Sequence, residues 1–137
     1  PGEILEVVPG LIATQHSGSG KANQFFLRGF NLDHGTDFLT TIEGVPVNLP
    51  THGHGHGYTD VNFVIPELIE KVEFRKGTYY AENGDFSSAG SANLVLKREL
   101  DEGLARLTVG SYNFNRLLVA DSARSGETAI LYATELQ

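Results

Sequence analysis

The sequence predicts an α+β fold: a small mixed β-sheet with short helices and long glycine-rich loops, followed by a run of antiparallel strands. Apolar residues at helical spacing open the chain, at Ile4, Leu5 and Val8. Residues 71–76 instead alternate between apolar and charged side chains, which is typical of a half-buried strand. The chain contains 16 glycines, well above the average of roughly 7%, and this indicates many turns.

The first expected domain covers residues 1–99. Pro9 and Gly10 end its first helix, because proline restricts the residue before it and glycine favours the end of a helix. The remaining elements are short and are separated by glycine, proline or polar residues. In chain order we expect a helix at 1–8, strands at 11–15, 24–30 (including Arg28), 38–43 and 45–49, a His/Gly loop at 51–57, a helical turn at 66–70, and strands at 71–76 and 92–97.

The second expected domain, residues 100–137, has a different texture. Three strand-like runs, 104–109, 115–120 and 127–135, are separated by short turns, which predicts an antiparallel meander. Neither face of the third run is strongly charged, as expected for a barrel wall that faces lipid. Three strands cannot close a barrel, since the smallest such barrels need about eight. The meander is therefore predicted to be part of an incomplete barrel.

Composition excludes several classes of function. The net charge of −7 argues against nucleic acid as a partner, because the chain has no basic stripe to displace phosphate counterions. Cysteine is absent, which excludes disulfides, thiolate metal sites and thiol nucleophiles. No apolar run approaches the length of a transmembrane helix.

Three segments carry a resemblance to a known family. They are Val8-Pro9-Gly10-Leu11, Leu27-Arg28-Gly29-Phe30 and the longer Ile-Glu-Lys-Val-Glu-Phe-Arg-Lys-Gly stretch at 69–77. In this order, and followed by Tyr80-Ala81 and a glycine-rich segment, the chain resembles the plug domain of TonB-dependent outer-membrane receptors over residues 1–99. It departs from the family pattern at Lys71, where arginine is usual, at Phe74, where a smaller aliphatic is usual, and at Thr78, where proline is usual.

The resemblance implies a transport protein of the outer membrane of a Gram-negative bacterium, and no enzyme. Its partners would be its own barrel, a small-molecule or metal-complex substrate, and the TonB energy-coupling protein, reached through a segment upstream of Pro1. The substrate class implied is a scarce nutrient, foremost an iron-siderophore or other metal complex. Arg28, Glu70 and Lys71 lie in stretches that in the family contact the barrel; the alternative is that they form ordinary surface ion pairs.

The most informative local pattern is a His/Gly loop. His52, His54 and His56 alternate with glycines, and residues two apart share a face of an extended chain. Imidazole suits Zn, Cu, Fe and Ni, so these residues are predicted to bind a metal, with Asp60 or His34 as a further ligand. His34, Tyr58 and the three loop histidines are also predicted to contact the substrate. No intrinsic cofactor is expected; a transition metal or iron chelate would be bound as substrate.

Three functions remain open at this point. The first is import of an iron-siderophore or other metal complex. The second is a receptor of the same fold for a free divalent ion, Zn, Ni or Cu, held by the His/Gly loop. The third is a small soluble metal-binding or hydrolytic protein, disfavoured because hydrolytic zinc sites place their ligands on rigid elements. In the alternative without metal, the loop is a solvated apex or binds an organic ligand by hydrogen bonds.

Overall fold

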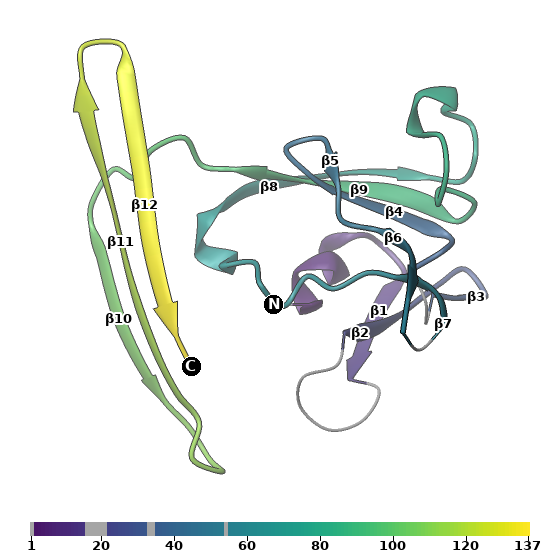
Figure 1. Cartoon of the computed structure of the whole chain (residues 1–137), viewed down its shortest axis with the longest axis horizontal. Coiled ribbons are helices and arrows are strands. Elements are labelled where there is room, and N and C mark those ends of the chain that lie inside the picture. Colours follow the sequence, from purple (N-terminus) through teal and green to yellow (C-terminus); the bar gives the residue numbers. More distant parts are fainter. Residues whose placement is uncertain (1, 16–21, 33–34, 54) are drawn as a thin grey trace. The chain divides into compact units, whose positions relative to one another are not determined.

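The chain forms two compact units, Pro1–Leu96 and Lys97–Gln137. The computed structural model describes residues 2–15, 22–32, 35–53 and 55–137. Figure 1 shows that short strands and irregular segments make up the first unit, and that three long strands make up the second.

Strand is the dominant secondary structure, so the predicted α+β class is wrong. Strands account for 54% of the structure and helix for 9%. No α-helix occurs in the part of the chain that the structure describes, and no helix there is long and apolar enough to cross a bilayer. The helical segments are 3₁₀ turns: Gly2–Val7 (η1), Pro66–Leu68 (η2) and Ala81–Asn83 (η3).

Segment length explains why the predicted short helices are not α-helical. Nucleating an α-helix is unfavourable, and isolated helices shorter than about 12 residues are marginal. The first segment is closed before Pro9 and instead makes the tighter i→i+3 bond, in which the Val8 N–H donates to the Leu5 carbonyl at 3.0 Å. Gly2, Leu5 and Val8 are buried, and their spacing of three residues is that of a 3₁₀ helix.

In the N-terminal sheet, two adjacent residues with a left-handed backbone conformation end a strand. Its antiparallel order is β1-β2-β3, with Leu27 opposite Phe30. Arg28 (φ +51°) and Gly29 (φ +83°) form the connection between these partners, and positive φ at both central residues is the geometry of a tight two-residue hairpin. The predicted strand at 24–30 is therefore two strands with Arg28 in the turn. The strands are Leu11–Gln15 (β1), Asn23–Leu27 (β2) and Phe30–Asn31 (β3).

The central sheet of the first unit is mixed, as the sequence predicts. Its order is β5-β4-β9-β8, with β4 and β9 parallel and the other pairs antiparallel. Glu43 and Gly44 make the same kind of tight hairpin as Arg28 and Gly29, with φ of +50° and +78°. The strands are Phe38–Ile42 (β4), Val45–Pro46 (β5), Ile69–Lys76 (β8) and Gly90–Leu96 (β9). A separate two-stranded hairpin joins Leu49–His52 (β6) to Gly55–Tyr58 (β7).

One hydrophobic core holds this unit together. It unites apolar side chains from η1, both sheets and the segments around Leu32, Val61 and Val64. Leu5, Leu27 and Leu94 are fully buried. The remaining core residues are Val8, Leu11, Phe25, Phe38, Ala89 and Ala92.

The second unit is an antiparallel meander with two unlike faces. Its strands are Leu104–Val109 (β10), Asn115–Ser125 (β11) and Thr128–Leu136 (β12), in the order β10-β11-β12. Paired residues share a face of a sheet, and the register therefore places most of the charged side chains on one of the two faces. One face carries Arg106, Arg116, Arg124 and Glu135; the other has Asp121 as its only charged residue and contains Leu107, Val109, Leu117, Val119, Ile130, Tyr132 and Leu136, all exposed.

Candidate functional site

The segment predicted as a His/Gly loop forms the β6–β7 hairpin. Leu49 pairs with Tyr58, Thr51 with His56 and His52 with Gly55, so the chain reverses between His52 and Gly55. The predicted extended geometry therefore does not hold across the three histidines, because a turn separates His52 from His56.

The histidines differ in their surroundings. The His52 ring is half-buried and meets the Tyr58 ring edge-on, with centroids 4.6 Å apart and an interplanar angle of 61°. His56 is exposed. His34 and His54 lie outside the described residues, and the described residues alone contain no group of three His, Cys, Asp or Glu that could hold a metal. The predicted metal site of His52, His54, His56 and Asp60 thus stays a prediction.

Tyr58 and Asp60 form a polar pair at the base of the hairpin. The Tyr58 hydroxyl donates to Asp60 Oδ2 at 3.3 Å, and the Asn62 N–H donates to Asp60 Oδ1 at 2.8 Å. Burial raises the pKa of the Tyr58 hydroxyl, and the charge and hydrogen bond of Asp60 raise that pKa further. Tyr58 is therefore held in its neutral form, as a hydrogen-bond donor toward a carboxylate.

The side chain of Asn48 holds the β6–β7 hairpin to β4 and to the segment before it. Its side chain is buried and fully satisfied: Oδ1 accepts from the Thr40 N–H at 2.7 Å, and Nδ2 donates to the carbonyls of Gly35 and Phe38 and to Thr59 Oγ1 at 2.7, 2.9 and 2.8 Å. This side chain ties the segment before β4 to both ends of the hairpin. Sequence reasoning missed it, because it placed Asn48 within the strand expected at 45–49, and nothing local indicates that its side chain is buried.

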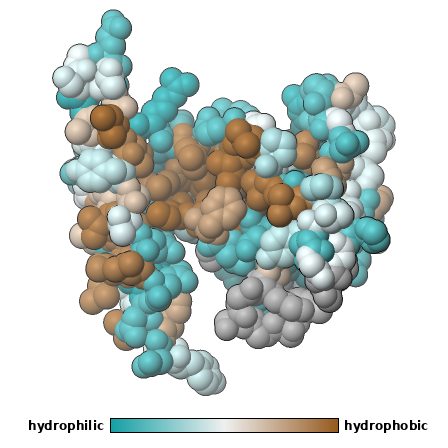
Figure 2. All heavy atoms as spheres, viewed as in Figure 1, coloured by the Kyte–Doolittle hydropathy of each residue, from teal (hydrophilic) through white to brown (hydrophobic). Residues whose placement is uncertain are grey.

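An open apolar groove lies beside the hairpin. Its volume is about 480 Å³, within the range of about 300–1,000 Å³ that is typical of ligand pockets. Tyr58 and Asp60 supply its polar lining. Figure 2 shows apolar side chains gathered on the surface of the first unit. The apolar lining of the groove consists of Ile42, Val45, Pro46, Val47, Leu49 and Phe63.

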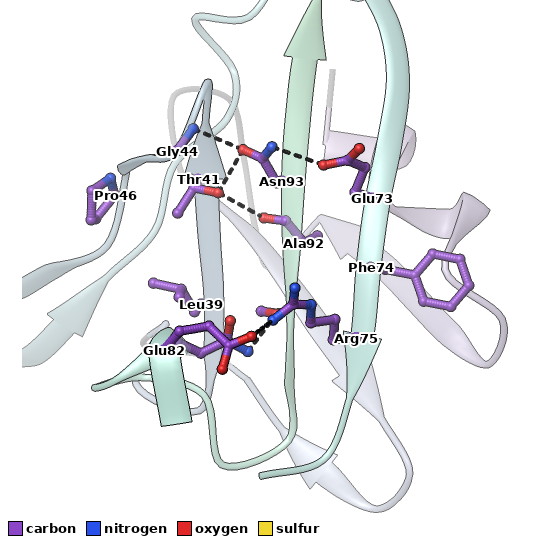
Figure 3. Close-up of a pocket in the computed structure, with 12 residues that line it drawn as sticks. Leu39, Thr41, Gly44, Pro46, Glu73, Phe74, Arg75, Glu82, Ala92 and Asn93 are labelled. Atoms are coloured by element: carbon purple, nitrogen blue, oxygen red, sulfur yellow. Dashed lines mark hydrogen bonds and ion pairs between the residues drawn. The ribbon is translucent and has the colours of Figure 1, made fainter. Parts of the chain in front are cut away.

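A second cleft of about 690 Å³, lined by both polar and apolar residues, lies on the face of the central sheet (Figure 3). Asn93 spans the sheet there: its Oδ1 accepts from Thr41 Oγ1 at 2.7 Å and from the Gly44 N–H at 2.9 Å, and its Nδ2 donates to Glu73 at 3.4 Å. Because Gly44 is in the β4–β5 turn and Asn93 in β9, this side chain fixes the hairpin against the central strand.

The far end of this cleft is closed by an ion pair. Arg75 of β8 pairs with Glu82 of η3, and its guanidinium lies 4.5 Å from the centre of the Tyr80 ring. A hydrogen bond to its own backbone and the contact with Arg75 lower the pKa of the Glu82 carboxyl. These contacts join the edge of the sheet to the segment between β8 and β9.

The decisive comparison is with a family model. The model of the TonB-dependent Receptor Plug Domain matches residues 1–91, about two-thirds of the chain. This chain belongs to the TonB-dependent receptor plug family. The resemblance seen in the sequence is therefore confirmed, and the matched residues include the β6–β7 hairpin, the groove and the cleft lining other than Ala92 and Asn93.

Membership establishes the general role of the plug. The family consists of outer-membrane receptors of Gram-negative bacteria, which work with an associated barrel and with TonB in transport. This is a transport family and not a family of enzymes, which favours the transport hypotheses over the hydrolytic alternative.

The residues predicted to contact the barrel occupy two separate places in the plug. Arg28 is exposed in the β2–β3 turn, whereas Glu70 and Lys71 are exposed on β8, an edge strand of the central sheet. Lys71 pairs with Glu73 at 2.7 Å, and that carboxylate raises the pKa of Lys71 while its own pKa is lowered by the lysine. Lys71 thus already has a surface partner within the plug, and barrel contacts by the three residues remain a prediction.

Proposed function

We propose that this plug closes the barrel of an outer-membrane receptor that imports a metal complex, foremost an iron-siderophore. The observation that carries the proposal is the grouping of possible ligand contacts in the β6–β7 hairpin. His52, Tyr58 and Asp60 come together there beside an apolar groove of about 480 Å³. Imidazole, phenol and carboxylate can contact a metal complex either as ligands to the ion or as hydrogen-bonding partners of the chelator.

We also propose that residues 100–137 begin the barrel itself. The support is the separation of side chains between the two faces of the β10–β12 meander. Outer-membrane barrels turn an apolar surface toward lipid and a polar one toward the lumen. The face with Leu107, Val119 and Ile130 suits lipid, and the face with Arg116 and Glu135 suits the lumen.

Calorimetry on the 137-residue chain tests the metal-complex proposal. The probes are ferric desferrioxamine, a trihydroxamate complex, and the free ions Zn²⁺, Ni²⁺ and Cu²⁺, each titrated at pH 7.5 and pH 5.5. The variant changes His52, His54 and His56 together to Ala, and His16→Ala is the matched control outside the hairpin. We expect the iron complex to bind the wild type and the control, and to bind the triple variant more weakly.

The free ions separate this proposal from the alternative receptor for a divalent ion. Coordination requires neutral imidazole, and the reference pKa of histidine, about 6.5, lies between the two pH values. Binding of a free ion that disappears at pH 5.5 and in the triple variant, without binding of the iron complex, would favour the divalent-ion receptor. Binding of every probe equally by wild type and triple variant would remove the hairpin from the site.

A further inference from the structure

The apolar groove beside the hairpin leaves large hydrophobic side chains uncovered. Val45 and Phe63 are each 67% exposed and Leu49 is 50% exposed, although the same unit buries comparable residues in its core. Ile42 and Val47 complete the apolar surface. Burying exposed apolar side chains is favourable in proportion to the area removed from water, so a ligand that covers the groove gains directly from its apolar area.

One negative charge lies in the lining of the groove. Asp60 is half-buried, and within the described part of the chain no lysine or arginine forms an ion pair with it. Its two hydrogen bonds, from Tyr58 and from Asn62, are both made by neutral donors. A carboxylate offers about four acceptor positions, so Asp60 retains both its charge and room to accept further hydrogen bonds.

The barrel wall is a poor match for this groove. The luminal surface of outer-membrane barrels is polar, and the strands β10–β12 place Arg106, Arg116, Arg124 and Glu135 on one face. An apolar concavity gains little against such a surface. Its chemistry instead fits a ligand that is apolar over most of its surface and positively charged at one end.

We propose that the groove binds an apolar organic group bearing a cationic or ammonium end, with the apolar body against Leu49 and Phe63 and the charge at Asp60. This inference rests on the proposed receptor function and specifies which part of the substrate the plug recognises. The substrate is then an amphipathic compound or complex with a hydrophobic cationic arm, rather than an anionic hydrophilic chelate.

Two small probes of nearly equal size and opposite charge test the inference. 1-Adamantanamine is a cation at pH 7 and 1-adamantanecarboxylate is an anion; each is titrated into the ¹⁵N-labelled 137-residue chain and followed by amide chemical shifts. We expect the amine to shift the amides of Val45, Leu49 and Asn62, and to bind at least about tenfold more tightly than the carboxylate. Equal affinities, or shifts confined to other parts of the chain, would overturn the inference.

Substitutions at exposed or half-exposed positions separate the charge from the apolar surface. Asp60→Asn keeps the shape of the side chain and should bring the two probes to nearly equal affinity. Phe63→Gln should weaken both probes, whereas Tyr79→Gln, at an aromatic side chain that is 86% exposed in the same unit, should change neither. A preference for the amine that survives Asp60→Asn would refute the role of that carboxylate.

The outcome is distinguishable from that of the metal-complex experiment. If neither probe binds while ferric desferrioxamine still binds through the hairpin, the groove inference fails and the proposed function stands. If the amine binds selectively while no metal complex or ion binds, the groove inference stands and the metal-complex substrate is rejected.

Discussion

The two units of this chain use the same kind of strand in opposite ways. In the plug, β9 has four of its first five residues buried, and Leu94 is fully enclosed in a core that the plug itself supplies. In the meander, β12 has no buried residue, and Ile130, Tyr132 and Leu136 are each more than half exposed. An alternating pattern of apolar and polar side chains therefore does not by itself show whether the apolar face of a strand is buried.

The two units differ in the surroundings that their apolar surfaces require. The plug buries an apolar core of its own and leaves part of its apolar surface uncovered in the groove. The meander leaves a whole apolar face uncovered, which is stable only against an apolar surrounding. Substitutions matched between the two units test this contrast.

The largest effect is expected in the core of the plug. Leu94→Ala should lower the free energy of unfolding by about 2–5 kcal/mol, because it removes buried methyl groups and leaves a cavity. Leu107→Ala in the meander, at a side chain that is 70% exposed, should stay within about 0.5 kcal/mol in water. Urea unfolding followed by circular dichroism, with hydrogen exchange of the β9 amides, measures both. Equal losses would show that the contrast between the units is false.

A smaller effect should follow loss of the buried amide of Asn48. Asn48→Ala leaves the Thr40 N–H and the Gly35 carbonyl without this partner, and a buried group left unsatisfied costs about 1–3 kcal/mol. In the meander, Tyr132→Phe removes an exposed hydrogen bond to Asp121 at 3.4 Å and should cost no more than about 0.5 kcal/mol. The same urea titrations apply. Asn48→Asp, which keeps the acceptor for Thr40 and loses the donors, should also destabilise; full stability in that variant would contradict the role of the donors.

The smallest effect concerns the exposed pair of Arg75 and Glu82. Because the pKa of Glu82 is lowered in the folded plug, first by its own backbone hydrogen bond and then by Arg75, its contribution is present above the unfolded pKa. It is lost as pH falls through the folded pKa. Glu82→Gln should therefore lower the thermal midpoint slightly at pH 7, and this difference should disappear as the pH falls below the folded pKa of Glu82, where the wild-type carboxyl is protonated. The difference at pH 7 should shrink in 1 M salt; a difference that does not decrease as the pH is lowered would assign it to something other than charge.

Many of the strands could be predicted from local sequence patterns, whereas the fold class of the chain could not. The alternation over 71–76 predicts a strand that the structure extends to Ile69–Lys76, and the Glu43-Gly44 turn predicts the β4–β5 hairpin. The helices were predicted from apolar spacing that fits a 3₁₀ turn as well as an α-helix over so few residues. Arg28 was placed in a strand because nothing in its own chemistry indicates a positive φ; the hairpin geometry imposes it.

The candidate site, too, could be predicted only in part from local sequence patterns. The sequence points to the hairpin residues because histidines and glycines alternate there, but it predicts a loop, since glycine is rarely favoured in strands. The network of Asn48 joins residues from 35 to 59, and the groove is lined from 42 to 63. Such assemblies depend on how separate segments meet in space. Which residues contact metal, substrate or barrel stays a prediction.

The parallel pairing of β4 with β9 affects the order in which the plug folds. Phe38 lies opposite Gly90 and Ile42 opposite Leu94, so the two strands must find each other across the whole intervening chain. Long sequence separation between paired strands slows folding, because the entropy of closing the loop is lost before the contacts form. During synthesis from the N-terminus, β4 emerges long before β9, and the central sheet can close only once β9 has been completed. The last strand of the plug is thus the one that completes it, and a chain truncated before β9 would lack the central strand that joins β4 to β8.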